Sequence, residues 1–197
     1  MTNWEKAASE LMQEAAANAE FSSQSISVGF KRLSDEATIP TKAHPTDSGF
    51  DLYASEDVII EPGETVIVPT GIAVDLPKGF EAQVRPRSGV TAKTKLRVQL
   101  GTIDNGYTGE IGVIVDNTSA DSHVSVEAGS GGYHLFDITE QRTETVSEVD
   151  VKSYIIRKGD RIAQLVVQAL PEVTAVEIEE FTEDSERGEG AFGSTGV

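Results

Sequence analysis

Short apolar runs recur along the chain from Ser25 onward, and clusters of glycine, proline and asparagine separate them. Many of the runs contain β-branched residues, and such segments punctuated by turn residues are typical of strands. Turns are predicted at 61–64, at 77–79 and at Asn105-Gly106. We expect strands at 26–30, 50–53, 58–60, 65–68, 72–76, 80–84, 111–115, 154–156 and 162–167. This rhythm predicts an all-β sandwich or barrel.

Three segments depart from the strand rhythm. Residues 4–20 carry apolar side chains at helical spacing, which predicts a short amphipathic helix within an N-terminal extension, 1–24. Residues 117–152 are polar and contain a glycine-rich stretch, so we interpret them as a surface insertion in a β domain that spans 25–181. Residues 182–197 have almost no apolar side chain except Phe192, and we expect a flexible C-terminal segment.

Composition narrows the possible functions. The 197 residues are enough for one domain, and a formal net charge of −17 argues against binding to nucleic acid or to an anionic membrane through bulk attraction. The absence of cysteine excludes disulfides, thiolate nucleophiles and cysteine-ligated zinc. We see neither a signal peptide nor a stretch of bilayer-spanning length. Because the chain as a whole is strongly acidic, a phosphate site in it must be locally basic.

Five clusters of glycine, acidic, basic and hydroxyl residues occur in series. They are Asp47-Ser48-Gly49-Phe50-Asp51-Leu52-Tyr53-Ala54, Pro86-Arg87-Ser88-Gly89, Gly101-Thr102-Ile103-Asp104-Asn105-Gly106-Tyr107-Thr108-Gly109-Glu110, Gly159-Asp160-Arg161-Ile162-Ala163-Gln164-Leu165 and Arg187-Gly188-Glu189-Gly190-Ala191-Phe192-Gly193-Ser194-Thr195-Gly196. In this order they resemble the five motifs of the trimeric dUTPase family, with an insertion between the third and fourth motifs like that of phage-type members. Each cluster alone is weak evidence, whereas five in order are specific.

The resemblance covers about residues 26–197 and implies a fold and an activity. The fold is a jelly-roll (β-clip-like) subunit in a homotrimer with exchanged C-terminal tails. The activity is magnesium-assisted attack of water on the α-phosphorus of dUTP, which gives dUMP and pyrophosphate, lowers dUTP and supplies dUMP for dTMP synthesis. We expect a cytoplasmic protein, in the host cytoplasm if a phage encodes it.

The third cluster supplies the candidate catalytic residue. The resemblance implies that Asp104 orients and deprotonates the attacking water, and that the ring of Tyr107 excludes a ribose hydroxyl. The backbone between Leu100 and Ile103, including Gly101, would form a hairpin that reads uracil. Some family members have an asparagine where this chain has Val98, so the backbone would have to recognise the base. From spacing alone, a turn-forming aspartate is the simpler interpretation of Asp104.

Phosphate contacts are expected from the second and fourth clusters. Arg87, Ser88 and Gly89 offer a guanidinium, a hydroxyl and an amide in one tight turn, and Gln164 is an amide in an otherwise apolar strand. A surface turn and a hydrogen-bonded strand amide are the structural alternatives. We expect Asp160 and Arg161 to form a structural pair without a catalytic part.

The resemblance also implies a metal site and a lid. Asp51 would support hydrated Mg²⁺ through water, whereas Asp47 is expected to cap its turn. The three histidines have no metal-ligand spacing, so zinc is not implied. In the tail, Phe192 would stack on uracil and Arg187 would bind phosphate. Further contacts are expected from Gly193, Ser194 and Thr195. A disordered acidic terminus is the alternative.

Three other functions remain open. A dCTP deaminase would attack the base instead of the phosphorus. The third cluster together with an aromatic residue in the tail argues against it, and ammonia release from dCTP would decide the question. A regulatory module would use 117–152 to contact a protein partner, alone or together with catalysis. A jelly-roll shell protein would explain the fold but not the five clusters.

Overall fold

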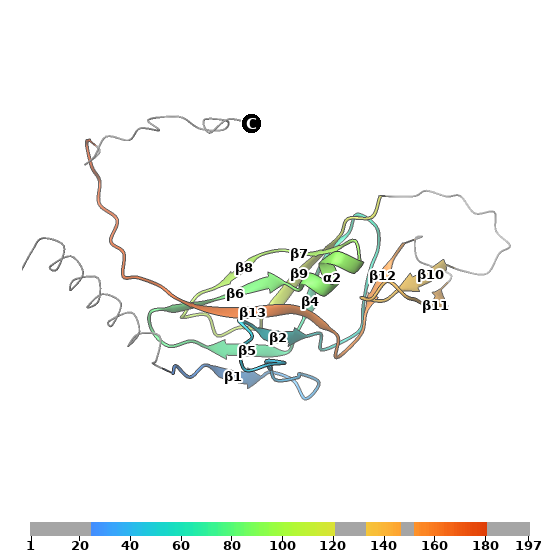
Figure 1. The fold of residues 1–197 in the computed structure, drawn as a ribbon, viewed down its shortest axis with the longest axis horizontal. Coiled ribbons are helices and arrows are strands. Elements are labelled where there is room, and N and C mark those ends of the chain that lie inside the picture. Colours follow the sequence, from blue (N-terminus) through green and yellow to red (C-terminus); the bar gives the residue numbers. More distant parts are fainter. Residues whose placement is uncertain (1–24, 121–132, 147–151, 181–197) are drawn as a thin grey trace, which may run out of the picture.

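The computed structural model describes residues 25–120, 133–146 and 152–180, and strands make up most of its regular structure (Figure 1). In chain order the elements are β1 (Gly29–Arg32), β2 (Phe50–Tyr53), β3 (Val58–Ile60), β4 (Thr65–Pro69), β5 (Ile72–Asp75), β6 (Phe80–Pro86), α2 (Ser88–Lys93), β7 (Leu96–Val98), β8 (Gly101–Ile103), β9 (Gly112–Asn117), β10 (Tyr133–Phe136), β11 (Arg142–Val146), β12 (Tyr154–Ile156) and β13 (Arg161–Ala169). Each of the nine predicted strands is present, although β1 begins three residues later than expected. The mostly β prediction is confirmed.

The strands form four small sheets, ordered β1-β5, β11-β10-β12-β3, β2-β13-β6-β8 and β4-β9-β7. Strand β13 lies centrally in the third sheet, antiparallel to both of its neighbours (Figure 1). Its register sets Gln164 opposite Asp51 on β2 and opposite Arg85 on β6. Residues more than 100 positions apart in the chain are therefore neighbours in this sheet.

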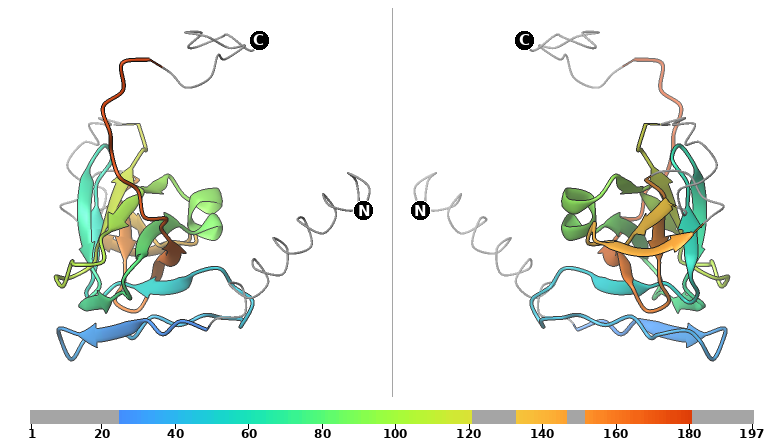
Figure 2. Two further views of the ribbon diagram at one scale, coloured as in Figure 1. Left: turned by 90° about the vertical axis from the view of Figure 1, so that its left-hand side faces the viewer. Right: turned by 90° about the vertical axis from the view of Figure 1, so that its right-hand side faces the viewer.

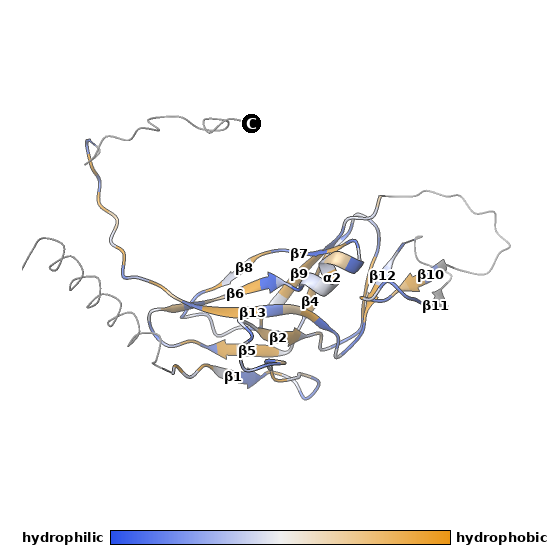
Figure 3. Cartoon of the chain, viewed as in Figure 1, coloured by the Kyte–Doolittle hydropathy of each residue, from blue (hydrophilic) through white to orange (hydrophobic). Residues whose placement is uncertain are grey.

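Alternation along the strands builds one continuous core. On β6, Ala82 and Val84 are buried, whereas Glu81, Gln83 and Arg85 lie on the other face. The same core takes side chains from β2, β4, β9 and β13, among them the fully buried Leu52, Val68 and Leu165. In Figure 3, β5 and much of β13 are coloured as hydrophobic. Full burial of such a side chain contributes roughly 1.5–3 kcal/mol.

The second cluster is not a simple turn, which corrects the sequence-based expectation. Arg87 is extended, and the helix α2 begins at Ser88. The helix buries Val90, whose carbonyl accepts from the Thr94 hydroxyl at 2.8 Å. The Arg97 guanidinium donates to the carbonyls of Thr91 and Thr94 at the end of the helix and to that of Leu96 in β7. Six residues are too few to show helical periodicity, so tertiary contacts decide this element.

The predicted hairpin at residues 100–103 is also wrong. Strand β8 pairs with β6, and β7 pairs with β9, so within the described residues the segment between them connects two sheets. The insertion contains two strands that the sequence did not predict, β10 and β11. Leu135 on β10 is fully buried, and its neighbour Phe136 packs against Tyr154 on β12.

Residues 170–180 leave the body of the molecule as an extended, exposed segment (Figure 2). Its start is fixed by the Leu170 amide, which donates to the Gly79 carbonyl at 2.8 Å. The predicted helix within 1–24 and the predicted lid at 182–197 lie outside the described residues. Among the residues that are described, no helix is long and apolar enough to cross a membrane.

Candidate active site

The first, second and fourth clusters converge on one open cavity of about 880 Å³. The cavity lies at the end of β6 and the start of α2, between the loop before β2 and the start of β13. The predicted residues Asp51, Arg87, Ser88, Gly89 and Gln164 all line it. Three separated segments of one chain therefore contribute to a single site.

Asp51 is the electrostatic centre of this cavity. Its side chain is only 13% exposed, and its two oxygens lie 3.0 Å from Arg87 Nε and 3.3 Å from Arg161 Nη1. Arg87 also donates to the Arg161 carbonyl at 3.1 Å, so the two arginines and Asp51 hold one another. Because a partly buried charge needs partners, this triad fixes where the cations point.

The expected pair between Asp160 and Arg161 is wrong. Arg161 contacts Asp51 instead, because strand pairing sets the start of β13 beside β2. Asp160 turns its carboxylate back to the Arg157 amide at 2.8 Å, within the turn before β13. Burial raises the pKa of Asp160, with a smaller contribution from the negative charge of Asp137, and the hydrogen bond from Arg157 opposes this.

Gln164 has the partner that a strand amide requires. Its Nε2 donates to the Pro86 carbonyl at 3.0 Å, which leaves Oε1 near Gly49. A Cβ at position 49 would come within 3.0 Å of that oxygen, so the close approach of the loop depends on glycine. In the same loop, Asp47 accepts from the His44 amide at 2.8 Å and caps its turn as expected.

Sequence reasoning missed two cations that line the cavity, Lys93 on α2 and Arg85 on β6. Its guanidinium donates to Gln83 Oε1 at 2.8 and 3.0 Å along the outward face of β6. The alternation of β6 was the signal that could have found it. Four cationic and three carboxylate side chains line the cavity: Arg85, Arg87, Lys93 and Arg161 against Asp47, Asp51 and Asp160. In a chain of net charge −17, this locally basic site suits a phosphate-bearing ligand.

The donor set fits magnesium held through water better than magnesium held directly. Both oxygens of Asp51 are paired with guanidinium groups, and no cluster of three His, Asp or Glu side chains suitable for a metal occurs among the described residues. Mg²⁺ gives up its water reluctantly and usually binds through one or two carboxylates together with substrate phosphates. With both oxygens already paired, Asp51 could contact magnesium here only through the water of a hydrated ion.

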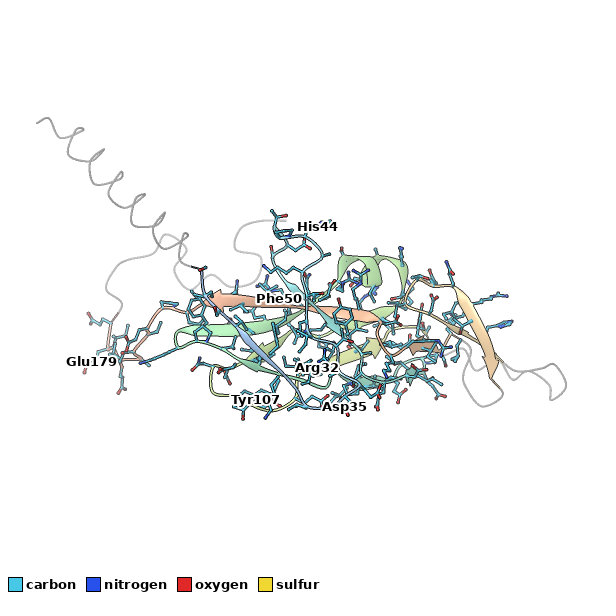
Figure 4. All side chains as sticks on the ribbon, turned by 90° about the horizontal axis from the view of Figure 1, so that it is seen from below. Arg32, Asp35, His44, Phe50, Tyr107 and Glu179 are labelled. Atoms are coloured by element: carbon cyan, nitrogen blue, oxygen red, sulfur yellow. The ribbon has the colours of Figure 1, made fainter. Side chains whose placement is uncertain are left out.

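Asp104 and Tyr107 are not in this cavity. The strand register sets Ile103 opposite Ala82, so Asp104 lies near the beginning of β6, whereas Ser88 follows its end. At about 3.3 Å per residue, the seven steps along the chain from Glu81 to Ser88 span roughly 20 Å. In Figure 4, Tyr107 lies on the opposite side of the molecule from His44, which belongs to the loop before β2.

The turn that carries Asp104 and Tyr107 is exposed but well defined. The Tyr107 amide donates to the Asp104 carbonyl at 3.0 Å, and Asn105 donates to the carbonyls of Leu76 and Pro77. The Tyr107 hydroxyl donates to the Glu110 carbonyl at 2.9 Å while 48% of the residue remains exposed. A Cβ at Gly109 would lie 2.5 Å from that hydroxyl, so the ring rests directly on a glycine.

The remaining predicted residues divide into two groups. Gly101 is half-buried in β8, while Ile103 is buried in the core, so the Ile103 side chain is structural. Val98 is half-buried in β7 opposite Val115. The predicted tail residues Arg187, Phe192, Gly193, Ser194 and Thr195 lie outside the described residues.

Comparison with known proteins agrees with the motifs. The profile of the dUTPase family matches residues 35–130 and 145–196, with a gap inside the insertion. A deoxyuridine 5′-triphosphate nucleotidohydrolase of Clostridioides difficile is 38% identical over 168 residues, which cover 84% of this chain and 95% of the relative.

Two phage enzymes provide the structural comparison. A mutant dUTPase of Staphylococcus bacteriophage 80alpha, solved with dUpNHpp, has a TM-score of 0.79 and 35% identity, over 88% of this chain and all of that one. A dUTPase from phage phi11 of S. aureus, solved to visualise its species-specific insert, has a TM-score of 0.73 and 31% identity, over 81% of this chain and all of that one. The chain therefore belongs to the dUTPase family and is a dUTP diphosphatase, which hydrolyses dUTP to dUMP and pyrophosphate.

Proposed function

We propose that the active site forms between copies of this chain in a homotrimer. One copy provides the cavity lined by Asp51, Ser88 and Gln164, here called the phosphate cavity. A neighbouring copy provides the turn that carries Asp104 and Tyr107, here called the Asp104 turn. The observation that carries this proposal is the roughly 20 Å of strand β6 that separates the two halves within one copy. A water held by Asp104 could not reach a phosphate bound at Ser88 of the same chain. A second copy is needed to bring the two together.

Exposed apolar side chains support association. Ile67 on β4 and Ile114 on β9 pair directly across the outer face of their sheet, 68% and 39% exposed. The extended segment after β13 exposes Val173, Val176 and Ile178 by 79%, 76% and 55%. Such strand-forming apolar residues are stabilised when another copy covers them. This supports both a subunit interface and an exchange of C-terminal tails.

In the assembled site, Asp104 takes a proton from water as the water oxygen bonds to the α-phosphorus. The bond from that phosphorus to its bridging oxygen breaks, and pyrophosphate leaves. Arg87, Ser88 and Gln164 hold phosphate oxygens, and Tyr107 packs against the deoxyribose. The backbone at Gly101 and Ile103 reads uracil. Positioning and electrostatic stabilisation account for most catalysis in phosphoryl transfer.

Magnesium and the tail complete the proposal. The dUTPase family uses Mg²⁺, which would be held here by Asp51 through water and would neutralise charge on the phosphates. Arg187 and Phe192 of the tail close over the nucleotide, with Gly193, Ser194 and Thr195 adding phosphate contacts. Ordering about ten residues costs on the order of 10 kcal/mol of backbone entropy, so the substrate must help the tail to dock.

Mixed trimers test the shared site. Asp104→Asn and Ser88→Ala should each be nearly inactive alone. If they are unfolded and refolded together at equal ratio, random assembly leaves about one site in four with both residues intact, so activity should return to about a quarter of wild type. Refolding each variant alone is the control. A mixture no more active than its components would contradict a site built from two copies.

A second function is favoured by the insertion. Phage dUTPases similar to this chain are described as controlling the transfer of virulence genes by a G protein-like mechanism. We propose that the insertion, 117–152, offers a regulatory protein partner a surface while the chain remains an enzyme. Replacing residues 121–132 with a short glycine-serine linker should preserve the trimer and dUTP turnover. Loss of the trimer would instead assign that segment a structural role.

A further inference from the structure

The turn between β10 and β11 belongs to the insertion, yet it forms part of the phosphate cavity. Ile138 and Thr139 line the same cavity as Ser88 and Gln164. The turn follows β10, whose backbone continues the sheet of β12 and β3. The insertion is thus more than an appendage beside the active site.

Asp137 holds this turn in a defined shape. One oxygen of its carboxylate accepts from the Thr139 amide at 2.8 Å, the Thr139 hydroxyl at 2.7 Å and the Gln141 amide at 3.0 Å. Partial burial alone would raise the pKa of Asp137, but these hydrogen bonds outweigh it and lower the pKa below its ordinary value. The turn is therefore a fixed wall.

The hairpin is also anchored to the domain. Leu135 is fully buried, and the Phe136 amide donates to the Ser153 carbonyl at 3.0 Å. Across the cavity edge, the charge of Asp137 reaches Asp160 in the fourth cluster and contributes to its raised pKa, after the larger effect of burial. The lining of the cavity by Ile138 and Thr139 thus brings the insertion turn to the phosphate side, and the effect of Asp137 on the pKa of Asp160 agrees with this.

We propose that residue 139 is a specificity-determining position that controls how tightly the site binds the β- and γ-phosphates of dUTP. This inference rests on the proposed function, in which the cavity holds the polyphosphate chain. The Thr139 hydroxyl donates its hydrogen bond to Asp137, so it presents no donor and no charge of its own to the cavity. Thr139 itself adds no charge to the four cations and three carboxylates of the cavity, whereas a charge at this position would act on the polyphosphate at short range.

Charge substitutions at two neighbouring positions test the proposal. Thr139→Glu should raise the KM for dUTP by about tenfold or more, with a much smaller change in kcat, and high salt should weaken the effect. Thr139→Lys should lower the KM. Gln141→Glu is the matched control, because it places the same charge in the same turn at an exposed position that, unlike Thr139, does not line the cavity. Its KM should change less than about twofold.

Three further measurements separate the possible outcomes. Binding of dUMP, which lacks the β- and γ-phosphates, should be far less affected by Thr139→Glu, and an unchanged melting temperature would exclude a folding defect. If Thr139→Glu and Gln141→Glu have the same KM, the proposal is overturned. Because Ser88→Ala should be nearly inactive, its dUTP binding is measured instead of its KM. Weaker dUTP binding by Ser88→Ala with no effect at position 139 refutes only this inference. If neither variant weakens dUTP binding, the cavity is not the polyphosphate site and the proposed function fails.

Discussion

The phosphate cavity and the Asp104 turn differ in how much of their surroundings one chain provides. In the cavity, Asp51 is 13% exposed and holds two arginines that come from distant segments. At the turn, Tyr107 is 48% exposed and Asp104 is also exposed, with no ion pair within the described residues. These contacts of the phosphate cavity are all supplied within one chain. The Asp104 turn has a defined shape, but its side chains remain exposed to solvent.

The open region is nevertheless rigid. Glu110 accepts from the Thr70 and Gly71 amides at 3.1 and 2.7 Å, which ties the end of the third cluster to the segment before β5. Asn105 ties its beginning to the loop after β5. A preorganised surface that is exposed in one copy costs little to bury against a second. In the proposed trimer, this difference would allow one short chain to divide its catalytic groups between copies.

The largest expected effect is at Asp104. Asp104→Asn should lower kcat by about a hundred- to ten-thousandfold, since the carboxylate is the proposed base. The melting temperature and dUTP binding should remain near wild type, because the side chain is exposed and makes no ion pair among the described residues. Steady-state kinetics measures the loss of kcat, and thermal unfolding measures the melting temperature. A near-normal kcat would remove Asp104 from the mechanism.

Gly109→Ala should reduce the discrimination between dUTP and UTP by about tenfold. The new methyl group would lie within 2.6 Å of two atoms of the Tyr107 ring system, so the ring must move from its place over the turn. Relative kcat/KM for the two nucleotides measures the effect. Gly106→Ala is the matched control, because a Cβ there meets no atom within 4 Å. Equal selectivity in both variants would show that ring position is unimportant.

Asp51→Asn makes the same aspartate-to-asparagine substitution in the phosphate cavity, where it should lower stability. Removing this charge leaves Arg87 and Arg161 without their carboxylate, so the free energy of unfolding should fall by about 1–3 kcal/mol, less than for a fully buried pair because both arginines are partly exposed. Denaturant unfolding measures it. If Asp104→Asn destabilises the protein as much as Asp51→Asn, the contrast between the two regions is lost.

The smallest effect concerns the pH dependence of the cavity wall. The pKa of Asp137 is lowered in the folded protein, so its contribution to stability is present above the ordinary value of 3.8 and is lost as the pH falls through the folded pKa. Acidification below that value should destabilise wild type more than Asp137→Asn. Asp160, whose pKa is raised, should behave oppositely, with its unfavourable contribution appearing as the pH rises above 3.8. Unfolding curves measured from pH 3 to pH 6 would check both signs.

The sequence by itself determined nine of the thirteen described strands, the order of the motifs and the family. In β6 and β9, buried side chains alternate with more exposed ones because successive residues of a strand point to opposite faces. This alternation can be recognised in the sequence without the structure. Roles for Asp104, Ser88 and Gln164 could likewise be proposed from residue type and motif context. These properties are local, and local spacing is what a sequence displays.

The tertiary structure decided which of those residues meet. The pairing of Arg161 with Asp51, the helix at Ser88 and the strands of the insertion depend on contacts across many tens of residues. The same is true of Thr139 beside the phosphate cavity and of Asp104 at the other end of β6. Strand register fixes such distances, and register is set by packing over the whole core rather than by any one segment.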